Sequence, residues 1–364
     1  MKLVGQGVSS CVLYPPYPCD GDNTKIKRNM VGKIMRPDKA DDEEKRYQII
    51  HSLDPKRIFS PKEVFRCKVG NHTKALLSKL NTLECNTFKG KKVDNLEQII
   101  MTNHGIPLYK YSFDRFNSIK YYMREIKRLL YCTSILRKNR LSHMDLHTGN
   151  VLVDPKTGKC TIIDFGELTR DKDVYSYVQR RVFTKKDYVQ FPPELILLSV
   201  IISHKNREDI GRVIEALDSK LVAMLEQGAR TGRLSGVIVR EFNTRSRYHK
   251  IIGDLLNPAD YPEVSRENLF SLRCKGVLTI HNTIKKYKSF AYACAMCFVT
   301  IDSYAIGLIL QKLSQKITIE NLDIVNTNEF QVVQRIIKRM TSSYIEERIS
   351  SKQALDIIID LNKR

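Results

Sequence analysis

Three side chains that can bind a cation or move a proton lie close together in the sequence. In HMDLHTGNVLVD, residues 143–154, Asp145 is followed by Asn150, and Asp164 comes after the apolar strand expected at 160–163. Asn150 offers a neutral oxygen and Asp164 a charged one, and Mg²⁺ prefers one or two carboxylates together with phosphate oxygens. Asp145 can accept a proton from an incoming hydroxyl. The set therefore predicts a site for Mg·ATP rather than a stand-alone metal cage.

A glycine-rich turn near the N-terminus could hold the phosphates. The stretch LVGQGVSSCVL places Gly5, Gly7, Ser10 and Val12 in a G-x-G-x-x-G-x-V pattern, with serine at the third glycine. Glycine lets the backbone pass close over phosphates and direct its N–H groups at them. Such turns are common between strands, so the pattern alone is not specific.

A lysine inside an apolar strand is the next candidate. Lys33 in VGKIM lies 28 residues after Gly5, and a half-buried ammonium needs an anionic partner. A phosphate could fill that role, and so could a carboxylate from the helix that follows. We expect Glu44, with Glu43 as the alternative, to provide the carboxylate.

These residues need strands and helices to position them. The first ~110 residues read as short strands and loops with one helix, and helices predominate after residue 115. Strands are expected at 2–4, 11–14, 30–35, 96–101 and 160–163, and helices at 41–53 and 121–136. The predicted organisation is α+β, with a small strand-rich lobe over 1–103 and a larger helical lobe over 104–364. The two lobes should meet near residues 102–105.

Composition sets outer limits on the function. The 364 residues are 42% hydrophobic and 28% charged, as in a globular protein. Apolar runs are too short for a membrane span, and the N-terminus lacks the apolar region of a secretory signal. Nine irregularly spaced cysteines favour reduced thiols in the cytoplasm over a disulfide framework, and the CxxC formed by Cys294 and Cys297 has no second ligand pair. The net charge of +21 would attract polyanions, but it is spread along the chain.

The ordered set G-x-G, V-x-K, H-x-D-x-x-x-x-N and D-F-G resembles the eukaryotic-type protein kinase superfamily. The resemblance continues downstream over nearly the whole chain. FPPEL, with Glu194, looks like the A-P-E motif that closes an activation segment. TIDSYAIGLIL looks like the helix whose aspartate and glycine, here Asp302 and Gly307, anchor the catalytic loop. Arg348 matches the arginine that pairs with the A-P-E glutamate.

The resemblance implies a bilobal protein-kinase-like fold that transfers the γ-phosphoryl group of Mg·ATP to serine or threonine hydroxyls of protein substrates. The catalytic residues would be Asp145, Lys33, Asn150 and His147, and the Mg²⁺ ligands would be Asn150 and Asp164. The nucleotide-binding residues would be Gly5, Gly7, Ser10, Val12, Lys33, Glu44, Met101 and Asn103. Several phrases, HMDLHTGN among them, also look like the divergent serine/threonine kinases of large cytoplasmic DNA viruses. That narrower resemblance implies a host-cytoplasmic protein that virions could package.

Two positions depart from the family pattern. The arginine of H-R-D is Met144 here, and in kinases that have it this arginine binds an activation-segment phosphate. We therefore do not expect control by phosphorylation of Thr169, Ser176 or Thr184. The catalytic-loop lysine is His147, a feature shared with small-molecule phosphotransferases such as those acting on aminoglycosides. A phosphotransferase of that type and a pseudokinase that acts as a binding module are the alternatives to a protein kinase.

A long segment separates Glu194 from Asp302, where protein kinases usually have a short connection. Residues 195–301 read mostly as helix and are expected to form a helical insertion in the larger lobe. Within them, the stretch 226–250 is rich in basic residues: Arg230, Arg233, Arg240, Arg245, Arg247 and Lys250. A solvated helical elaboration is the simpler interpretation. The alternative is a docking surface for an acidic partner or nucleic acid.

Overall fold

The structure of the protein is a computed structural model. It describes all residues except 22, 24, 70–72, 91–94, 113–117, 181–190, 204–206, 234, 257–265, 321, 343 and 362–364. The chain forms two compact units, one of residues 1–115 with 148–168 and one of residues 116–147 with 169–364. Residues 104–115 and 148–168 belong to the N-terminal unit, whereas the sequence prediction placed them in the larger lobe.

The N-terminal unit is built on an antiparallel sheet of five strands in the order β1-β2-β3-β5-β4. The strands are β1 (Lys2–Gln6), β2 (Cys11–Tyr14), β3 (Met30–Met35), β4 (Val64–Lys68) and β5 (Glu97–Thr102). All six residues of β3 are buried because the strand is central, with β2 on one side and β5 on the other. Lys33 lies in this strand, opposite Val12 on β2 and Ile99 on β5.

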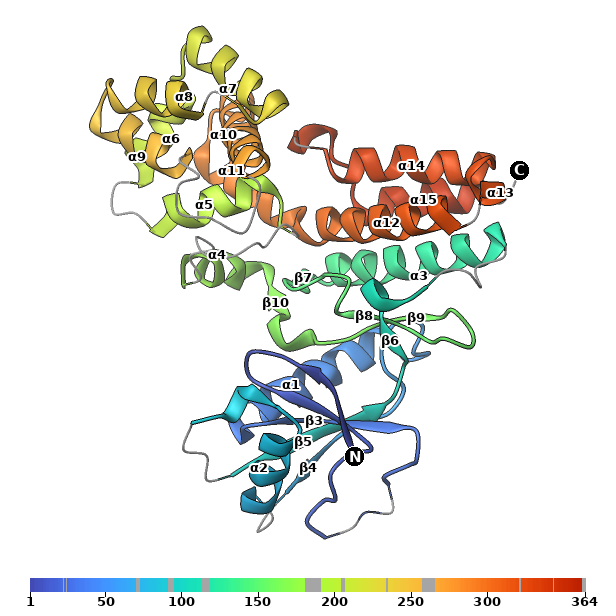
Figure 1. Cartoon of the computed structure of the whole chain (residues 1–364). Helices are drawn as coiled ribbons and strands as arrows, with labels where there is room; N and C mark the ends of the chain where they lie inside the picture. The colour runs from blue at the N-terminus through green and yellow to red at the C-terminus, as the bar shows by residue number, and fades with distance from the viewer. Residues whose placement is uncertain are drawn as a thin grey trace. The chain divides into compact units, whose positions relative to one another are not determined.

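Helix α1 (Pro37–Leu53) follows β3 and packs against β4 and β5 (Figure 1). Proline at its start is compatible with the first helical turn, where the missing N–H would have no intrahelical acceptor. The segment between β4 and β5 contains a second helix, α2 (Thr73–Thr82), and the short η2 (Asn86–Phe88). The expectation of a single helix in the first 110 residues is therefore wrong.

A second, three-stranded sheet completes this unit. Its order is β6-β8-β9, formed by β6 (Ile106–Pro107), β8 (Val151–Val153) and β9 (Cys160–Ile162). Gly105, directly before β6, has φ of 103°, and a Cβ there would lie 2.1 Å from the carbonyl oxygen of Val153. Only glycine fits this close approach, which lets the chain enter the small sheet.

The second unit is helical apart from a two-stranded ladder of β7 (Leu141–Ser142) and β10 (Thr169–Arg170). Helix α3 (Ile119–Lys138) packs against α12 and α15, and α14 packs against both of these (Figure 1). Nine of its residues are buried at helical spacing, as the sequence predicts for this segment. The last helices are α12 (Ile301–Glu320), α13 (Leu322–Val325), α14 (Asn328–Met340) and α15 (Ser351–Leu361), with η5 (Ile345–Glu347) before α15.

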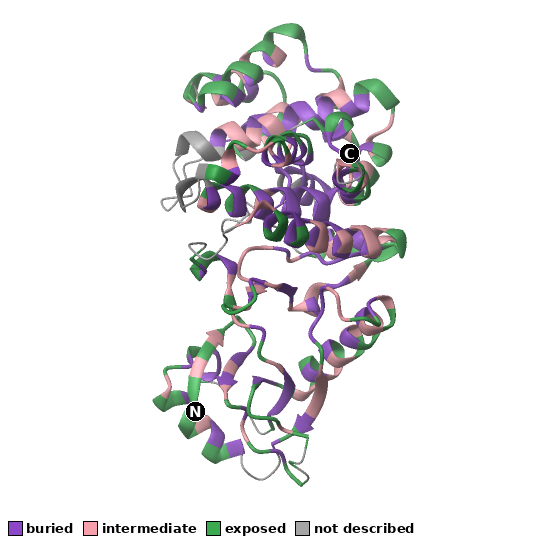
Figure 2. Cartoon of the chain, turned by 90° about the vertical axis from the view of Figure 1, so that its right-hand side faces the viewer, coloured by how far each residue is buried: buried purple, intermediate pink, exposed green. Residues whose placement is uncertain are grey.

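The described residues of 195–301 are mostly helical, as predicted, and share one hydrophobic core with Met144 and Phe191. Figure 2 shows the buried positions of the chain in purple. The helices are α5 (Pro193–Ser203), α6 (Arg207–Glu215), α7 (Ser219–Thr231), α8 (Ser235–Asn243), α9 (Arg247–Leu256), α10 (Arg266–Tyr287) and α11 (Phe290–Val299). Helix α10 packs closely on α5, because a Cβ at Gly276 would lie only 2.8 Å from the carbonyl oxygen of Pro193. The insertion is therefore part of the core around the FPPE segment.

The cysteines correct the sequence prediction of reduced thiols. Two disulfides lie in the N-terminal unit, Cys11–Cys85 and Cys19–Cys67, which bridge 74 and 48 positions of sequence. Both pairs join segments that the five-stranded sheet and the segment between β4 and β5 bring together in space. The spacing of the cysteines in the sequence does not predict these pairs. Cys294 and Cys297 are free and buried.

No single helix in the part of the chain that the structure describes is long and apolar enough to cross a bilayer. One pair, residues 290–299 with 301–317, meets the length and composition criteria jointly but is bent by 44°. Both segments contribute buried side chains to the helical unit.

Candidate functional site

The centre of the N-terminal unit holds a buried ion network around Lys33. The Lys33 Nζ atom lies 2.9 and 2.8 Å from the two carboxylate oxygens of Glu43 and 2.9 Å from Oδ1 of Asp164. Burial alone would lower the pKa of Lys33, but the carboxylates of Asp164 and Glu43 outweigh it and raise that pKa. The lysine therefore stays an ammonium, ready to bind an anion in a buried position.

The carboxylate that pairs with Lys33 belongs to Glu43, so the preference for Glu44 is wrong and its alternative is right. Glu43 lies on the buried face of α1 with Ala40, Tyr47 and Ile50. Glu44 lies one residue further around the helix and faces Arg66 on β4, whose Nη1 is 3.8 Å from the Glu44 carboxylate. The 3.6-residue period of the apolar residues distinguishes the two positions.

The two predicted metal ligands lie at the same end of the β8–β9 hairpin. Val151 pairs with Ile162, and the carbonyl oxygen of Asn150 accepts a hydrogen bond of 2.9 Å from the N–H of Ile163. Asn150 directly precedes β8 and Asp164 comes two residues after β9, so the antiparallel pairing brings them to one place. Asn150 is buried, whereas the Asp164 side chain is 36% exposed.

These two side chains fit a magnesium ion whose remaining ligands come from a nucleotide and water. Among the described residues, no group of three or more histidine, cysteine, aspartate or glutamate side chains could hold a metal by itself. Mg²⁺ usually keeps several waters and binds through one or two carboxylates plus substrate phosphates, so one aspartate and one asparagine beside a lysine suit it. Asp164 also lies close to Gly166, where a Cβ would come within 3.0 Å of the Asp164 Oδ1 atom.

The glycine-rich turn is the tip of the β1–β2 hairpin. The N–H of Gly7 donates to the carbonyl oxygen of Ser10 at 2.8 Å, and the register shifts between Leu3 and Gly5. The hydroxyl of Thr87 donates to the carbonyl oxygen of Gly7 at 2.8 Å, and the disulfide at Cys11 lies next to the turn. The segment around η2 therefore braces the hairpin, a feature that the sequence analysis missed.

Met101 and Asn103 lie where β5 ends. Met101 is buried and pairs with Val31 and Val64 on the neighbouring strands. The N–H of Asn103 donates to the carbonyl oxygen of Asn29 at 2.8 Å, and its side-chain oxygen accepts from the N–H of Gly105 at 3.0 Å. These bonds shape the turn, and a role for the two residues in nucleotide binding stays a prediction.

The helical unit carries the second group of predicted residues, in the loop after β7. The Nε2 atom of His147 lies 3.8 Å from the nearer carboxylate oxygen of Asp145, and both side chains are partly exposed. The N–H of Asp145 donates to Nδ1 of the buried His143 at 3.3 Å. On this short loop the carboxylate can accept a proton, and the N–H of the imidazole beside it can donate a hydrogen bond to an anion.

Asp302 fixes the backbone of this loop, as the resemblance implied. Its carboxylate accepts from the N–H of His143 at 2.6 Å and from the N–H of Met144 at 3.3 Å. Burial raises the pKa of Asp302 to about 6, although the two backbone hydrogen bonds act against this shift. Helix α12 thereby holds the residues directly before Asp145.

Met144 fills a place in the core. It is 1% exposed and belongs to the hydrophobic cluster that includes Phe191 and Leu195. Its φ is 66°, in the left-handed region that L-residues rarely adopt, so the surrounding contacts hold the loop in an unfavourable backbone conformation. Methionine at this position is thus accommodated by packing.

Glu194 and Arg348 form a fully buried ion pair, as the resemblance implied. The guanidinium nitrogens lie 2.6 and 3.3 Å from the two carboxylate oxygens, and neither side chain is exposed. Arg348 also donates to Oγ1 of Thr300 at 2.8 Å and to the carbonyl oxygen of Ser342. Much of the segment before Glu194, with Thr184, falls on residues 181–190, outside the described part of the chain.

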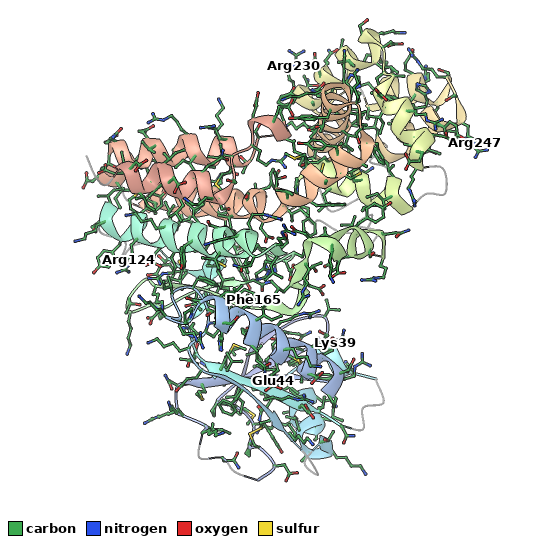
Figure 3. The ribbon with its side chains drawn as sticks, turned by 180° about the vertical axis from the view of Figure 1, so that it is seen from behind. Lys39, Glu44, Arg124, Phe165, Arg230 and Arg247 are labelled. Carbon is green, nitrogen blue, oxygen red and sulfur yellow. A yellow bond between two sulfur atoms is a disulfide. The ribbon has the colours of Figure 1, made fainter. Side chains whose placement is uncertain are left out.

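The basic residues of 226–250 are distributed over α7, α8, α9 and the connections between these helices. Figure 3 shows Arg230 and Arg247 on different parts of the insertion. Arg245 is paired with Asp218 and with Glu241, which also binds Lys220. Arg245 is therefore already paired with acidic neighbours of the same insertion.

Comparisons with known proteins add no family. No known family model and no curated protein sequence matches the chain. The functional assignment therefore depends on the motifs and on the geometry described above.

Proposed function

We propose that the protein is an ATP-dependent protein kinase that phosphorylates serine and threonine hydroxyls. The observation that carries this proposal is the position of Lys33 between Glu43 and Asp164, which is 131 residues away in sequence. A strand lysine held by a helix glutamate and facing the aspartate of D-F-G is the arrangement that protein kinases use for ATP phosphates. The strand order β1-β2-β3-β5-β4, with a helix between β3 and β4, is consistent with the same family.

Each residue has a defined task in this proposal. Lys33 binds the α- and β-phosphates, and Glu43 keeps its ammonium in place. Asn150 and Asp164 would hold Mg²⁺, which when bound neutralises charge on the phosphates. The glycine-rich turn with Gly5 and Gly7 covers the phosphates with backbone N–H groups.

Asp145 accepts the proton of the attacking hydroxyl. It precedes Asn150 by five residues, so the backbone alone keeps the two within about 17 Å of each other. His147, 3.8 Å from Asp145, can donate a hydrogen bond to a phosphoryl oxygen in place of the usual lysine. Asp302 positions this loop through its backbone, so the proton acceptor is supported by a buried group.

Two features favour a protein kinase over the alternatives. The Glu194–Arg348 pair and the Asp302 anchor belong to scaffolds that bind protein substrates, which disfavours a small-molecule phosphotransferase. Met144, His147 and the long insertion suggested a pseudokinase, but Met144 packs in the core. The complete set of Lys33, Asp145 and Asp164 favours an active enzyme.

The proposal is tested by incubating the protein with γ-labelled ATP, Mg²⁺ and either casein or a basic protein as the phosphate acceptor. Label should appear on serine and threonine, and chelation of Mg²⁺ should prevent this. The same incubation is repeated with small aminated sugars as the acceptor. Transfer of label to these sugars and to neither protein would favour the small-molecule phosphotransferase. Nucleotide binding without any transfer would favour the pseudokinase.

A further inference from the structure

One face of α1 reaches the segment from Asp164 to Gly166. Glu43, Arg46 and Tyr47 are spaced i, i+3 and i+4, which places them on the same side of the helix. A guanidinium nitrogen of Arg46 donates to the carbonyl oxygen of Gly166, and the Tyr47 hydroxyl accepts from the N–H of Asp164 at 3.3 Å. The adjacent residues Arg46 and Tyr47 thus hold the segment 164–166 at both ends, in addition to the bond between Lys33 and Asp164.

The Tyr47 hydroxyl is not explained by packing. The ring is 1% exposed and meets Phe165 edge-on, with centroids 5.6 Å apart and planes at 79°. Phenylalanine would make the same ring contact without bringing a hydroxyl into the interior, where an unbonded polar group is unfavourable. The hydroxyl is a phenol whose oxygen can accept the hydrogen bond from the N–H of Asp164.

The backbone of Asp164 needs such restraint. Its φ is 60° and its ψ 61°, the left-handed conformation, which is unfavourable for a residue with a side chain. A conformation of this kind persists only where the surroundings hold it. The bond to the Asp164 N–H acts directly on the strained residue, and the bond to the Gly166 carbonyl acts two residues later.

We propose that Arg46 and Tyr47 are positioning residues, which set the direction of the Asp164 carboxylate by fixing the backbone on both sides of it. The proposal rests on the proposed function, in which Asp164 binds the metal of a metal–nucleotide complex. Neither residue touches the nucleotide in this account. Their effect is therefore confined to the metal-dependent part of nucleotide binding.

The test measures binding of the fluorescent analogue mant-ATP as a function of Mg²⁺, and again in excess EDTA. Tyr47→Phe keeps the ring and removes the acceptor, and Arg46→Met removes the donor and keeps most of the apolar stem of the side chain. Lys45→Met is the matched control on the same helix, because Lys45 is exposed and forms an i, i+4 pair with Asp41. We expect each of the first two variants to need about threefold to tenfold more Mg²⁺ for half-saturation, the effect of one hydrogen bond. Binding in EDTA and the Lys45→Met variant should match the wild type.

Hydrogen exchange gives a second readout that does not depend on nucleotide. The Asp164 amide should exchange faster in Tyr47→Phe than in the wild type, since its acceptor is gone. Equal weakening of mant-ATP binding with and without Mg²⁺ would mean that the residues only support the fold, and would overturn the proposal.

Asp164→Asn separates the failure of this inference from the failure of the proposed function. If Asp164→Asn abolishes the Mg²⁺ dependence while Tyr47→Phe and Arg46→Met behave like the wild type, the positioning role is refuted and the metal role of Asp164 stands. If Asp164→Asn itself keeps the wild-type Mg²⁺ dependence, Asp164 holds no metal and both proposals fail.

Discussion

Removal of Arg348 should strongly destabilise the protein, although Arg348 has no part in the proposed chemistry. The Glu194 carboxylate is completely buried and receives two hydrogen bonds from the guanidinium, at 2.6 and 3.3 Å. Arg348→Met keeps apolar volume at the site but leaves this carboxylate with no counter-charge. A buried charge that loses its partner is strongly unfavourable, even where the intact pair adds little net stability.

The expected magnitude is about 3–5 kcal/mol for Arg348→Met, the range measured when one member of a buried pair is removed. At roughly 2–4 °C per kcal/mol for a unit of this size, the melting temperature should fall by about 10 °C. Glu194→Gln should also be destabilising, because it leaves the guanidinium buried without its counter-charge. The double variant should lose much less than the sum, with a coupling of about 2 kcal/mol or more.

The measurement is a double-mutant cycle of denaturant unfolding, followed by fluorescence or circular dichroism. Lys352→Ala, which removes the exposed i, i+4 pair with Asp356, serves as the control and should change stability little. Phosphoryl transfer should fall in both single variants, although neither residue is assigned a catalytic role. Strict additivity of the two substitutions would refute the pairing and, with it, the interpretation of FPPE as the end of an activation segment.

Three further predictions concern regulation, pH and redox state. Phosphatase treatment should change activity by less than about threefold, or ~0.7 kcal/mol, because Met144 is buried and cannot bind a phosphate; a large loss would point to another cation such as Arg180. The pKa of Asp302 is about 6 in the folded protein, against an ordinary 3.8, so the folded state binds the proton of this carboxyl more tightly than the unfolded state does. The proton therefore adds at most about 3 kcal/mol to the free energy of unfolding. This contribution is present below pH 4 and is lost as the pH rises through 6. Unfolding curves of the wild type and Asp302→Asn should therefore diverge between pH 4 and 6.5, and parallel curves would contradict the shift. Reduction of the disulfides Cys11–Cys85 and Cys19–Cys67 should lower the free energy of unfolding by about 2–4 kcal/mol each. The measurement is the unfolding of the wild type and of single Cys→Ser variants with and without reductant. Equal stability of the wild type and the variants under both conditions would exclude the two disulfides.

Strong local patterns predicted much of the fold. The strand Met30–Met35 has the bounds expected from its continuous apolar run, because a central strand is buried on both faces. The helix over 121–136 was equally clear, and the structure extends it to Ile119–Lys138. The helix at 41–53 begins four residues earlier, at Pro37, because proline is compatible with a first turn and was not recognised as a start.

The elements that the sequence analysis missed have weak patterns. Strand β4 reads VFRCK, and it pairs on one side only, with β5, so polar residues are tolerated there. Helix α2, Thr73–Thr82, lies in a segment between strands that the analysis treated as loop. The disulfides depend on residues 48 and 74 positions apart that only the folded sheet brings together, so no local pattern could reveal them.

The candidate site shows the same division. Motif spacing selected Lys33, Asp145, Asn150 and Asp164 as candidates, and the structure brings Lys33 and Asp164 within hydrogen-bond distance. The choice between Glu43 and Glu44 required the helical phase of α1, which Ala40, Tyr47 and Ile50 define once the helix start is known. The contacts of Arg46 with Gly166 and of Tyr47 with Asp164 join residues 120 and 117 positions apart, so they belong to tertiary structure alone.

The central claim is that Asp145 and Lys33 carry phosphoryl transfer from Mg·ATP to a protein hydroxyl. The most direct measurement is the rate of label transfer from γ-labelled ATP to casein by the wild type, Asp145→Asn and Lys33→Met, with the fold of each variant checked by circular dichroism and thermal melting. Each variant should stay folded and lose transfer by orders of magnitude, and Asp145→Asn should still bind mant-ATP. Transfer at the wild-type rate by either folded variant would contradict the account.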